Sequence, residues 1–298
     1  YVFTDTIRSH FLRVLETVAT GQGQGFWVQA EYGAGKTHFL VALAALLANT
    51  SEAFWTLATD EDARQYARRL HATRLFPVIV SLRGMGQADT FRDRSLLDVL
   101  LEEGFQPALA QAGLDGAVQI TSADDYMLWL EQTATSIRED VDAYVRSKTG
   151  KSTGHYRDEE GASALAELIA AYCRQHAIHP QIATGVKDRL AHIYRQLLRL
   201  PGTPYNGLLI VIDEYEGWER AHPAPQMRAH DEDVLETLAY LLPRDLGYQV
   251  YTIVASQSSA PAKLRGGAAG DRFINIPLLA TTNEHDYDII ISRRVRAL

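Results

Sequence analysis

The chain has 298 residues, of which 46% are hydrophobic and 22% charged, and its formal net charge is -8 at pH 7. This length is enough for one large domain or two ordinary ones, and the acidic balance argues against a basic coat for nucleic acid. With Cys173 as its one cysteine, the chain can form neither an internal disulfide nor a cysteine-based zinc cluster, which fits a reducing, cytoplasmic compartment. Because no run of 18 apolar residues occurs, we expect no membrane span.

Helical and extended patterns alternate along the chain. An apolar stripe predicts a helix over 5–19, and a strongly apolar segment predicts another over 36–48. Short apolar runs predict strands over 26–30, 76–82, 207–214, 248–256 and 272–279. Strands that alternate with helices predict an α/β fold with a mainly parallel five-stranded sheet.

A long helical region separates the second predicted strand from the third. We interpret 94–200 as a helical insertion between an N-terminal part of the core, 1–93, and a C-terminal part, 201–283. Helical spacing within the insertion is found at 123–148, 160–176 and 185–199.

The two ends indicate a piece of a longer protein. The chain begins Tyr1-Val2-Phe3-Thr4, with neither a methionine nor a signal peptide, and it stops at Leu298 within a helical pattern. We therefore expect this chain to be a module of a larger protein.

The stretch QAEYGAGKTHFL, residues 29–40, fits a phosphate-binding loop. The pattern is G-x-x-x-x-G-K-[ST] between a strand and a helix. Here Gly35-Lys36-Thr37 supplies its end, and Ala30 replaces the first glycine, as the broader form of the pattern accepts. A plain glycine turn with a surface lysine is the alternative, but the strand, the spacing and the helix all agree with the loop.

The residue types in this loop predict its chemistry. Backbone N–H groups of residues 33–37 would hold phosphate oxygens at the positive end of the helix. Lys36 would reach the β and γ oxygens, and the Thr37 hydroxyl would ligate Mg²⁺. The expected nucleotide-binding residues are Ala30, Glu31, Tyr32, Gly33, Ala34, Gly35, Lys36, Thr37 and His38.

An acidic pair, Asp213-Glu214, ends the most apolar predicted strand. Asp213 at the strand tip could meet the magnesium held by Thr37, and Glu214 could polarise the attacking water. A solvated turn is the alternative interpretation of such a pair. Since no Asn-Lys-x-Asp guanine-reading motif occurs, the sequence predicts Mg²⁺-dependent hydrolysis of ATP.

Two later positions are further candidates for this chemistry. Gln257, with Ser256 as the second choice, follows the fourth strand and could orient the water, or it could only cap the strand. Arg272, with Arg265 as the second choice, precedes the fifth strand and could neutralise transition-state charge in a neighbouring subunit's site. A surface salt bridge is the alternative for either arginine.

Together these motifs resemble the ASCE division of P-loop ATPases. They supply A-x-x-x-x-G-K-T (Walker A), then an apolar strand ending in D-E (Walker B), then a polar sensor strand. The tail DRFINIPLLATTNEHDYDIIISRR resembles the origin-recognition branch of the AAA+ group. This resemblance implies the sheet order 5-1-4-3-2 and makes 284–298 the start of a truncated lid region.

More narrowly, GFWVQAEYGAGKTHFLVALAALL and LLIVIDEYEGWE are similar to the large ATPase subunits of bacteriophage-exclusion (BREX and Pgl) antiviral defence operons. The resemblance implies an ATP-hydrolysing module that assembles or remodels a complex acting on foreign DNA. Its implied partners are further copies of the chain or other subunits of the defence complex, with DNA reached through the full-length protein. Two alternatives stay open: a nucleotide-dependent binding switch or scaffold with little hydrolysis, and a DNA-handling motor.

Overall fold

The computed structural model describes most of the chain. The residues outside the description are 1–4, 31–34, 49–54, 56–60, 86–93, 116, 119, 121–122, 157–158, 179–184, 223, 258, 262–263, 265–271 and 279–298. The chain divides into two compact units, one made of Tyr1–Val118 and Tyr194–Leu298, the other of Gln119–Ile193.

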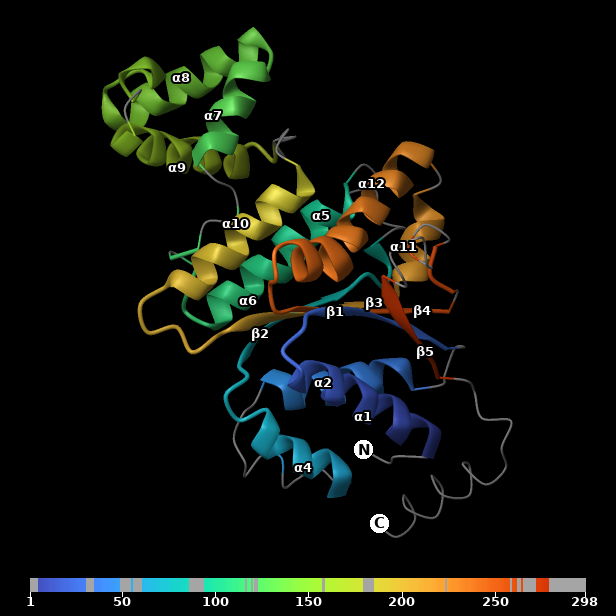
Figure 1. Cartoon of the computed structure of the whole chain (residues 1–298). Helices are drawn as coiled ribbons and strands as arrows, with labels where there is room; N and C mark the ends of the chain where they lie inside the picture. Colours follow the sequence, from blue (N-terminus) through green and yellow to red (C-terminus); the bar gives the residue numbers. More distant parts are fainter. Residues whose placement is uncertain are drawn as a thin grey trace, which may run out of the picture. The chain divides into compact units, whose positions relative to one another are not determined.

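The first unit is built around a five-stranded sheet in which every strand pairing is parallel (Figure 1). The strands are β1 Gln24–Gln29, β2 Leu75–Ser81, β3 Gly207–Asp213, β4 Val250–Ser256 and β5 Phe273–Pro277. Each of the five predicted strands is present, and the sheet order is β2-β3-β4-β1-β5, which reads 5-1-4-3-2 from the β5 edge. Every residue of β3 and β4 is buried, as expected for strands covered on both faces.

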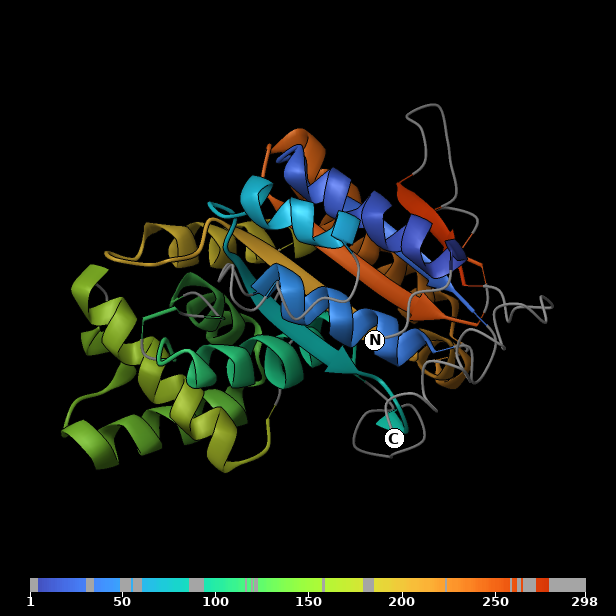
Figure 2. The same ribbon diagram turned by 90° about the horizontal axis from the view of Figure 1, so that it is seen from below.

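Among the described residues, one face of the sheet is covered by helices from the N-terminal part of the chain (Figures 1 and 2). They are α1 Asp5–Ala19, α2 Lys36–Ala48 and α4 Glu61–Arg69. Their apolar side chains form one core with alternate residues of the strands, among them Phe11, Leu15, Phe39, Leu43, Phe26 and Ile253. The helices predicted over 5–19 and 36–48 are therefore confirmed.

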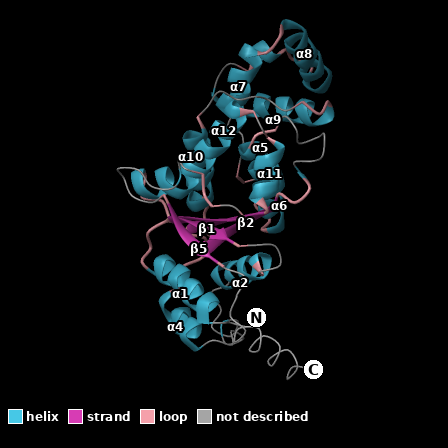
Figure 3. Cartoon of the chain, turned by 90° about the vertical axis from the view of Figure 1, so that its right-hand side faces the viewer, coloured by secondary structure: helices cyan, strands magenta, loops and turns pink. Residues whose placement is uncertain are grey.

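The other face of the sheet also carries helices (Figures 1 and 3). They are α5 Leu96–Val99, the π-helix η3 Leu100–Phe105, α6 Gln106–Gln111, α11 Tyr215–Ala221, α12 Pro225–Glu236 and the π-helix η5 Thr237–Asp245. Gly25 of β1 allows η5 to approach closely, because a Cβ at this position would lie 2.4 Å from the Cβ of Ala239. On this face, Trp27 makes edge-to-face contacts with Tyr215 and Phe273, with ring centroids 5.6 Å apart in each pair.

The helical insertion differs in extent from the predicted 94–200. Residues up to Val118 group with the sheet, because η3 packs directly on β2: a Cβ on Gly104 would lie 2.7 Å from a γ-carbon of Val80. The separate helical unit covers Gln119–Ile193. Its C-terminal boundary falls within the helix α10, Val186–Arg199. The residues predicted to start a lid, 284–298, lie outside the described part of the chain.

The helical unit has a hydrophobic core of its own. It contains α7 Ala123–Gln132, α8 Thr135–Thr149, the short η4 Thr153–His155 and α9 Glu159–Gln175. The buried side chains are Trp129, Leu130, Val141, Val145, Leu165, Ile169, Tyr172 and Cys173. The helix predicted over 123–148 is in fact two helices, because Ala134 has an extended backbone with φ -59° and ψ 147°. Among the described residues, no helix combines the length and apolarity needed to cross a bilayer.

Candidate active site

The predicted site residues other than Arg272 and Arg265 lie at or beyond the carboxyl ends of three parallel strands. β1 ends at Gln29 and β3 ends at Asp213, while β4, which lies between them, ends at Ser256. In an open α/β sheet, ligands bind beyond the carboxyl ends of the strands. The topology therefore brings the glycine-rich turn and the acidic pair to one edge, as the sequence predicts.

A direct hydrogen bond joins Thr37 to Asp213, which lie 176 residues apart in the sequence. The Thr37 hydroxyl donates to Oδ2 of Asp213 over 2.9 Å. The other carboxylate oxygen, Oδ1, accepts the backbone N–H of Glu214, also at 2.9 Å. Because both oxygens are engaged and Asp213 is only 7% exposed, its carboxylate is held in one orientation toward the start of α2.

Lys36 is a buried cation at the first position of α2, with 6% of the residue exposed. Its Nζ donates to the carbonyl oxygen of Ala30 over 2.9 Å. Ala30 continues the β1–β4 ladder, since its N–H donates to the Ser256 carbonyl at 3.1 Å. The lysine side chain thus joins the two ends of the predicted loop. The central residues of this loop, Glu31, Tyr32, Gly33 and Ala34, lie outside the described part of the chain.

Gly35 turns the chain into α2. Its φ of +84° lies in the left-handed region, which glycine adopts without the cost that a Cβ brings. Its carbonyl accepts the N–H of Phe39 at 3.0 Å, the first bond of the helix, and His38 is exposed in the first turn. Since the amino end of an α-helix carries partial positive charge, α2 adds to the positive field around Lys36.

Glu214 has a strained backbone. Its φ of 61° and ψ of 35° place it in the left-handed region, where a non-glycine residue costs about 1–2 kcal/mol. Among the described non-glycine residues, Glu214 shares a positive φ only with Ala177. Strain of this kind tends to gather at functional sites, where surrounding contacts maintain it. The strained position coincides with the residue predicted to polarise water.

Two hard oxygen ligands, the Thr37 hydroxyl and the Asp213 carboxylate, lie within hydrogen-bonding distance of one another. Oxygen ligands of this kind suit Mg²⁺, which typically takes one or two protein oxygens and keeps several waters. Within the described residues, no group of three or more His, Cys, Asp and Glu side chains is arranged to hold a metal. The Thr37 hydroxyl and the Asp213 carboxylate are thus of the oxygen type that Mg²⁺ takes.

The sensor candidates follow β4 at the same edge. Ser256 pairs in register with Gln29 and is buried, whereas Gln257 is exposed directly beyond the strand end. Gln257 directly follows β4, the strand that lies between β1, which leads to Lys36, and β3, which ends at Asp213. This placement favours Gln257 over Ser256 as the residue that could reach a bound ligand.

Arg272 lies at the opposite, amino-terminal edge of the sheet. It precedes Phe273, which pairs with Gly25 near the start of β1. Its guanidinium forms a 2.7 Å ion pair with Glu236 and lies over the Tyr240 ring, 5.7 Å from the centroid. Arg272 is thus held within its own chain and cannot join Lys36 and Asp213 there. A role in a neighbouring subunit stays a prediction, and Arg265 lies outside the described residues.

A buried carboxylate behind the site has no counterpart in the predicted residues. Asp231 of α12 is 2% exposed, and its oxygens accept N–H groups from the Trp218 indole and the Leu96 backbone, each at 2.8 Å. Burial raises the pKa of Asp231 above its usual range, while these two hydrogen bonds act in the opposite direction. In the sequence HDEDV, no feature distinguishes Asp231 from the neighbouring acidic residues. Its burial and its two hydrogen bonds can be recognised only in the fold.

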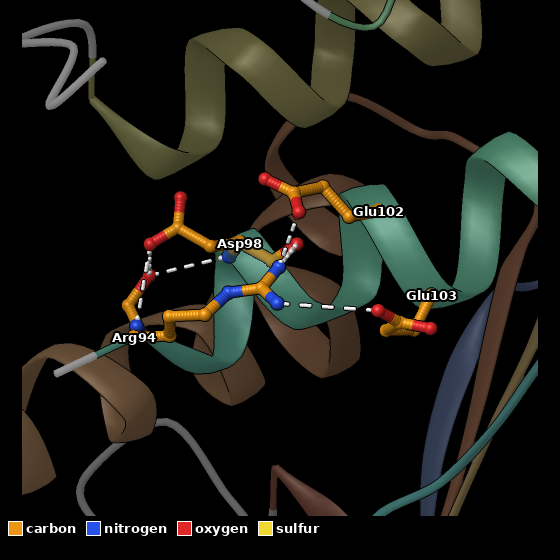
Figure 4. A network of polar contacts seen from close by, with 5 residues as sticks. Arg94, Asp98, Glu102 and Glu103 are labelled. Carbon is orange, nitrogen blue, oxygen red and sulfur yellow. Dashed lines mark hydrogen bonds and ion pairs between the residues drawn. The ribbon is translucent and has the colours of Figure 1, made fainter. Parts of the chain in front are cut away.

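A second network of polar contacts, which includes Arg94, Asp98 and Glu102, stabilises the start of α5 (Figure 4). Ser95 and Asp98 form a capping box, in which each side chain accepts the other's backbone N–H. Arg94, with 11% of its side chain exposed, forms an ion pair with Glu102 at 2.6 Å and a longer one with Glu103 at 3.9 Å. These contacts hold the start of α5 in place.

Comparison of the chain with protein-family models, with curated proteins and with solved structures finds no significant match. The case for a function therefore depends on the geometry of the site and on the motifs that compose it.

Proposed function

We propose that this chain is a P-loop ATPase module that binds ATP with Mg²⁺ and hydrolyses the γ-phosphate. The observation that carries the proposal is the 2.9 Å hydrogen bond between Thr37 and Asp213. In P-loop enzymes, the loop Ser or Thr and the aspartate at a strand tip together hold the metal. The contact pairs two motifs that the sequence predicts separately for the same ion, which supports their shared role.

Different residues of the chain would bind the phosphates and the magnesium. Lys36 and the amino end of α2 provide positive charge for the β- and γ-phosphate oxygens, and Gly35 lets the backbone approach them. Thr37 and Asp213 would hold the Mg²⁺, which when bound neutralises the charge of the phosphates. The Lys36 ammonium would exchange the Ala30 carbonyl for phosphate oxygens. The ammonium therefore has an oxygen partner in both states.

In the proposed reaction, a water oxygen forms a bond to the γ-phosphorus as the bond to the bridging oxygen breaks. Glu214 accepts the proton of that water, and ADP leaves with the bridging oxygen. Gln257 would orient the water from the end of β4. The strained backbone of Glu214, with φ 61°, supports this role because strain of this kind is found at functional sites and Glu214 directly follows Asp213 at the strand tip.

Phosphate release from ATP tests the proposal. We expect Mg²⁺-dependent release by the protein, and its loss in Lys36→Ala because the phosphate charge is no longer balanced. Glu214→Gln should keep ATP binding but lose turnover by about 100-fold or more. Lys151→Ala, which removes an exposed lysine of the helical unit, is the matched control and should leave turnover unchanged. Turnover that persists at the wild-type level in Lys36→Ala would refute the proposal.

A nucleotide-dependent binding switch is the second candidate. It is favoured by the ion pair that holds Arg272 against Glu236, because Arg272 would have to leave this pair before it could assist hydrolysis in a neighbour. The switch predicts equally low phosphate release by the wild type and Glu214→Gln, with ATP binding intact in both. The ATPase predicts a large difference between these two proteins.

We further propose that the ATP cycle serves a larger phage-defence assembly acting on foreign DNA. The support for this role is the likeness of 25–47 and 208–219 to the ATPase subunits of BREX and Pgl systems. In cells, Glu214→Gln should accumulate in the ATP-bound state and retain partner subunits through purification. Identical sets of co-purifying proteins with the wild type, Lys36→Ala and Glu214→Gln would contradict this role.

A further inference from the structure

Asp231 connects three helices near Glu214: α12, to which it belongs, α11 and α5. Its Oδ2 accepts the indole N–H of Trp218 on α11 at 2.8 Å. Its Oδ1 accepts the backbone N–H of Leu96, at the start of α5, also at 2.8 Å. Trp218 is fully buried and Asp231 is 2% exposed. A carboxylate buried to this degree is costly unless its oxygens are hydrogen-bonded, and here each oxygen has a donor.

α11 is a seven-residue helix that begins directly after Glu214. At its start, Tyr215 packs edge-on against Trp27 of β1. At its end, the His222 carbonyl accepts a hydrogen bond from Nε of Arg228 at 3.0 Å. Between these points, Trp218 provides the bond to Asp231. Because the helix is so short, a rotation at Trp218 would also move Glu214.

The left-handed backbone of Glu214 makes this anchoring important. A residue held at φ 61° and ψ 35° stays there only when its surroundings restrain it. On one side, Asp213 accepts the Glu214 N–H and fixes the end of β3. On the other side, the restraint comes from α11, and Asp231 supplies its buried polar contact.

We propose that Asp231 is a positioning residue for the ATPase reaction: through Trp218 it fixes α11 and so directs Glu214 toward the attacking water. The inference rests on the proposed function, because Glu214 is placed for that reaction. Asp231 is 2% exposed, so it would act on the reaction through the position of α11 and not by direct contact with the nucleotide. Its second bond, to Leu96, ties α11 to the chain that follows β2, so α5 and α11 are held by one carboxylate.

Two substitutions remove the proposed link from its opposite ends. Asp231→Asn replaces one acceptor oxygen by an NH₂ group, which cannot accept a hydrogen bond from the facing N–H group. Trp218→Phe removes the indole donor while keeping an aromatic ring in the core. We expect each to lower kcat by about 10- to 100-fold, as for a catalytic group displaced by about 1 Å, with KM for ATP nearly unchanged.

The double variant tests whether the two residues act together. Because the inference has both residues act through the hydrogen bond that joins them, the kcat of Trp218→Phe combined with Asp231→Asn should be no lower than that of the single variant with the lower kcat. Multiplied losses would mean that the residues act independently and would overturn the inference.

Asn206 provides a matched structural control. It also ties two segments through two hydrogen bonds, donating from Nδ2 to the Ala72 carbonyl at 2.7 Å and accepting the Arg74 N–H at 2.9 Å. It precedes β3 and therefore lies at the edge of the sheet opposite Glu214. Asn206→Ala should lower the melting temperature but leave kcat unchanged.

The outcomes separate this inference from the proposed function. A wild-type kcat in both Asp231→Asn and Trp218→Phe overturns the inference alone, as does a fall in kcat that Asn206→Ala reproduces at equal loss of stability. If Asp231→Asn does not fold, Trp218→Phe still decides. Absence of Lys36-dependent turnover in the wild type overturns the proposed function and this inference with it.

Discussion

At the residue scale, some side chains of the candidate site can be identified from the sequence, whereas Asp231 can be identified only from the structure. Lys36, Thr37 and Asp213 are predictable because the chemistry of a phosphate loop fixes residue type and spacing together. Asp231 is not predictable in this way, because its partners, Trp218 and Leu96, come from different helices and follow no spacing rule. Residue type and spacing thus identify the groups expected to contact a ligand, but not a buried carboxylate whose partners come from distant segments.

Strain at Glu214 leads to a prediction about stability and activity together. Glu214→Gly should raise the free energy of unfolding by about 1 kcal/mol, because glycine adopts a positive φ without a Cβ clash. This corresponds to an increase in melting temperature of roughly 2–4 °C, measured by calorimetry. The same variant should lose phosphate release, since the proposed general base is absent.

Ala177 is the control for this trade-off, because its φ of 51° is also left-handed and it follows α9 in the helical unit. Ala177→Gly should be stabilising to a similar extent while turnover stays at the wild-type level. If Glu214→Gly destabilises the protein whereas Ala177→Gly stabilises it, the strain assigned to Glu214 is wrong.

At the element scale, secondary structure was largely readable from apolar runs and their boundaries. The five strands are apolar segments that end at polar or turn residues, so the sequence locates them to within two residues of the observed bounds. The break between α7 and α8 was missed because Thr133-Ala134 carries neither glycine nor proline. Both α7 and α8 pack against α9, an arrangement that a local pattern does not encode.

The contact between α1 and α4 predicts a pH dependence of stability. Arg69 forms two hydrogen bonds with Glu16, at 2.5 and 2.8 Å, and the Tyr66 hydroxyl adds a third at 2.6 Å. Arg69 foremost, and then Tyr66, lower the pKa of Glu16 to about 2. A carboxyl whose pKa is depressed on folding stabilises the protein above its unfolded pKa, and this contribution is lost as pH falls toward the folded value.

Urea unfolding of Glu16→Gln at several pH values measures this effect. The variant should be less stable than the wild type at pH 7, and the difference should shrink between about pH 4.5 and pH 2, where Glu16 of the wild type becomes protonated. The pair is exposed, so about 1 M salt should also reduce the difference at pH 7. A difference that is independent of both pH and salt would show that Glu16 acts through packing.

At the scale of the whole molecule, the class of architecture follows from the sequence but the extent of the insertion does not. Alternating strands and helices predict the parallel sheet, and the motifs predict which strand ends meet. Residues 94–118 belong to the predicted insertion, yet they group with the sheet because Gly104 allows η3 to pack on β2. Helical periodicity indicates that a helix has a buried face, but not which unit buries it.

The central claim is that Thr37 and Asp213 share one ion beside a phosphate held by Lys36. A crystal structure of Glu214→Gln with ATP and Mg²⁺ tests it most directly, because this variant should bind nucleotide without consuming it. The account predicts β- and γ-phosphate oxygens against the Lys36 ammonium and a magnesium between the Thr37 hydroxyl and Asp213. Nucleotide bound at any other place, or a metal held without these two residues, would contradict it.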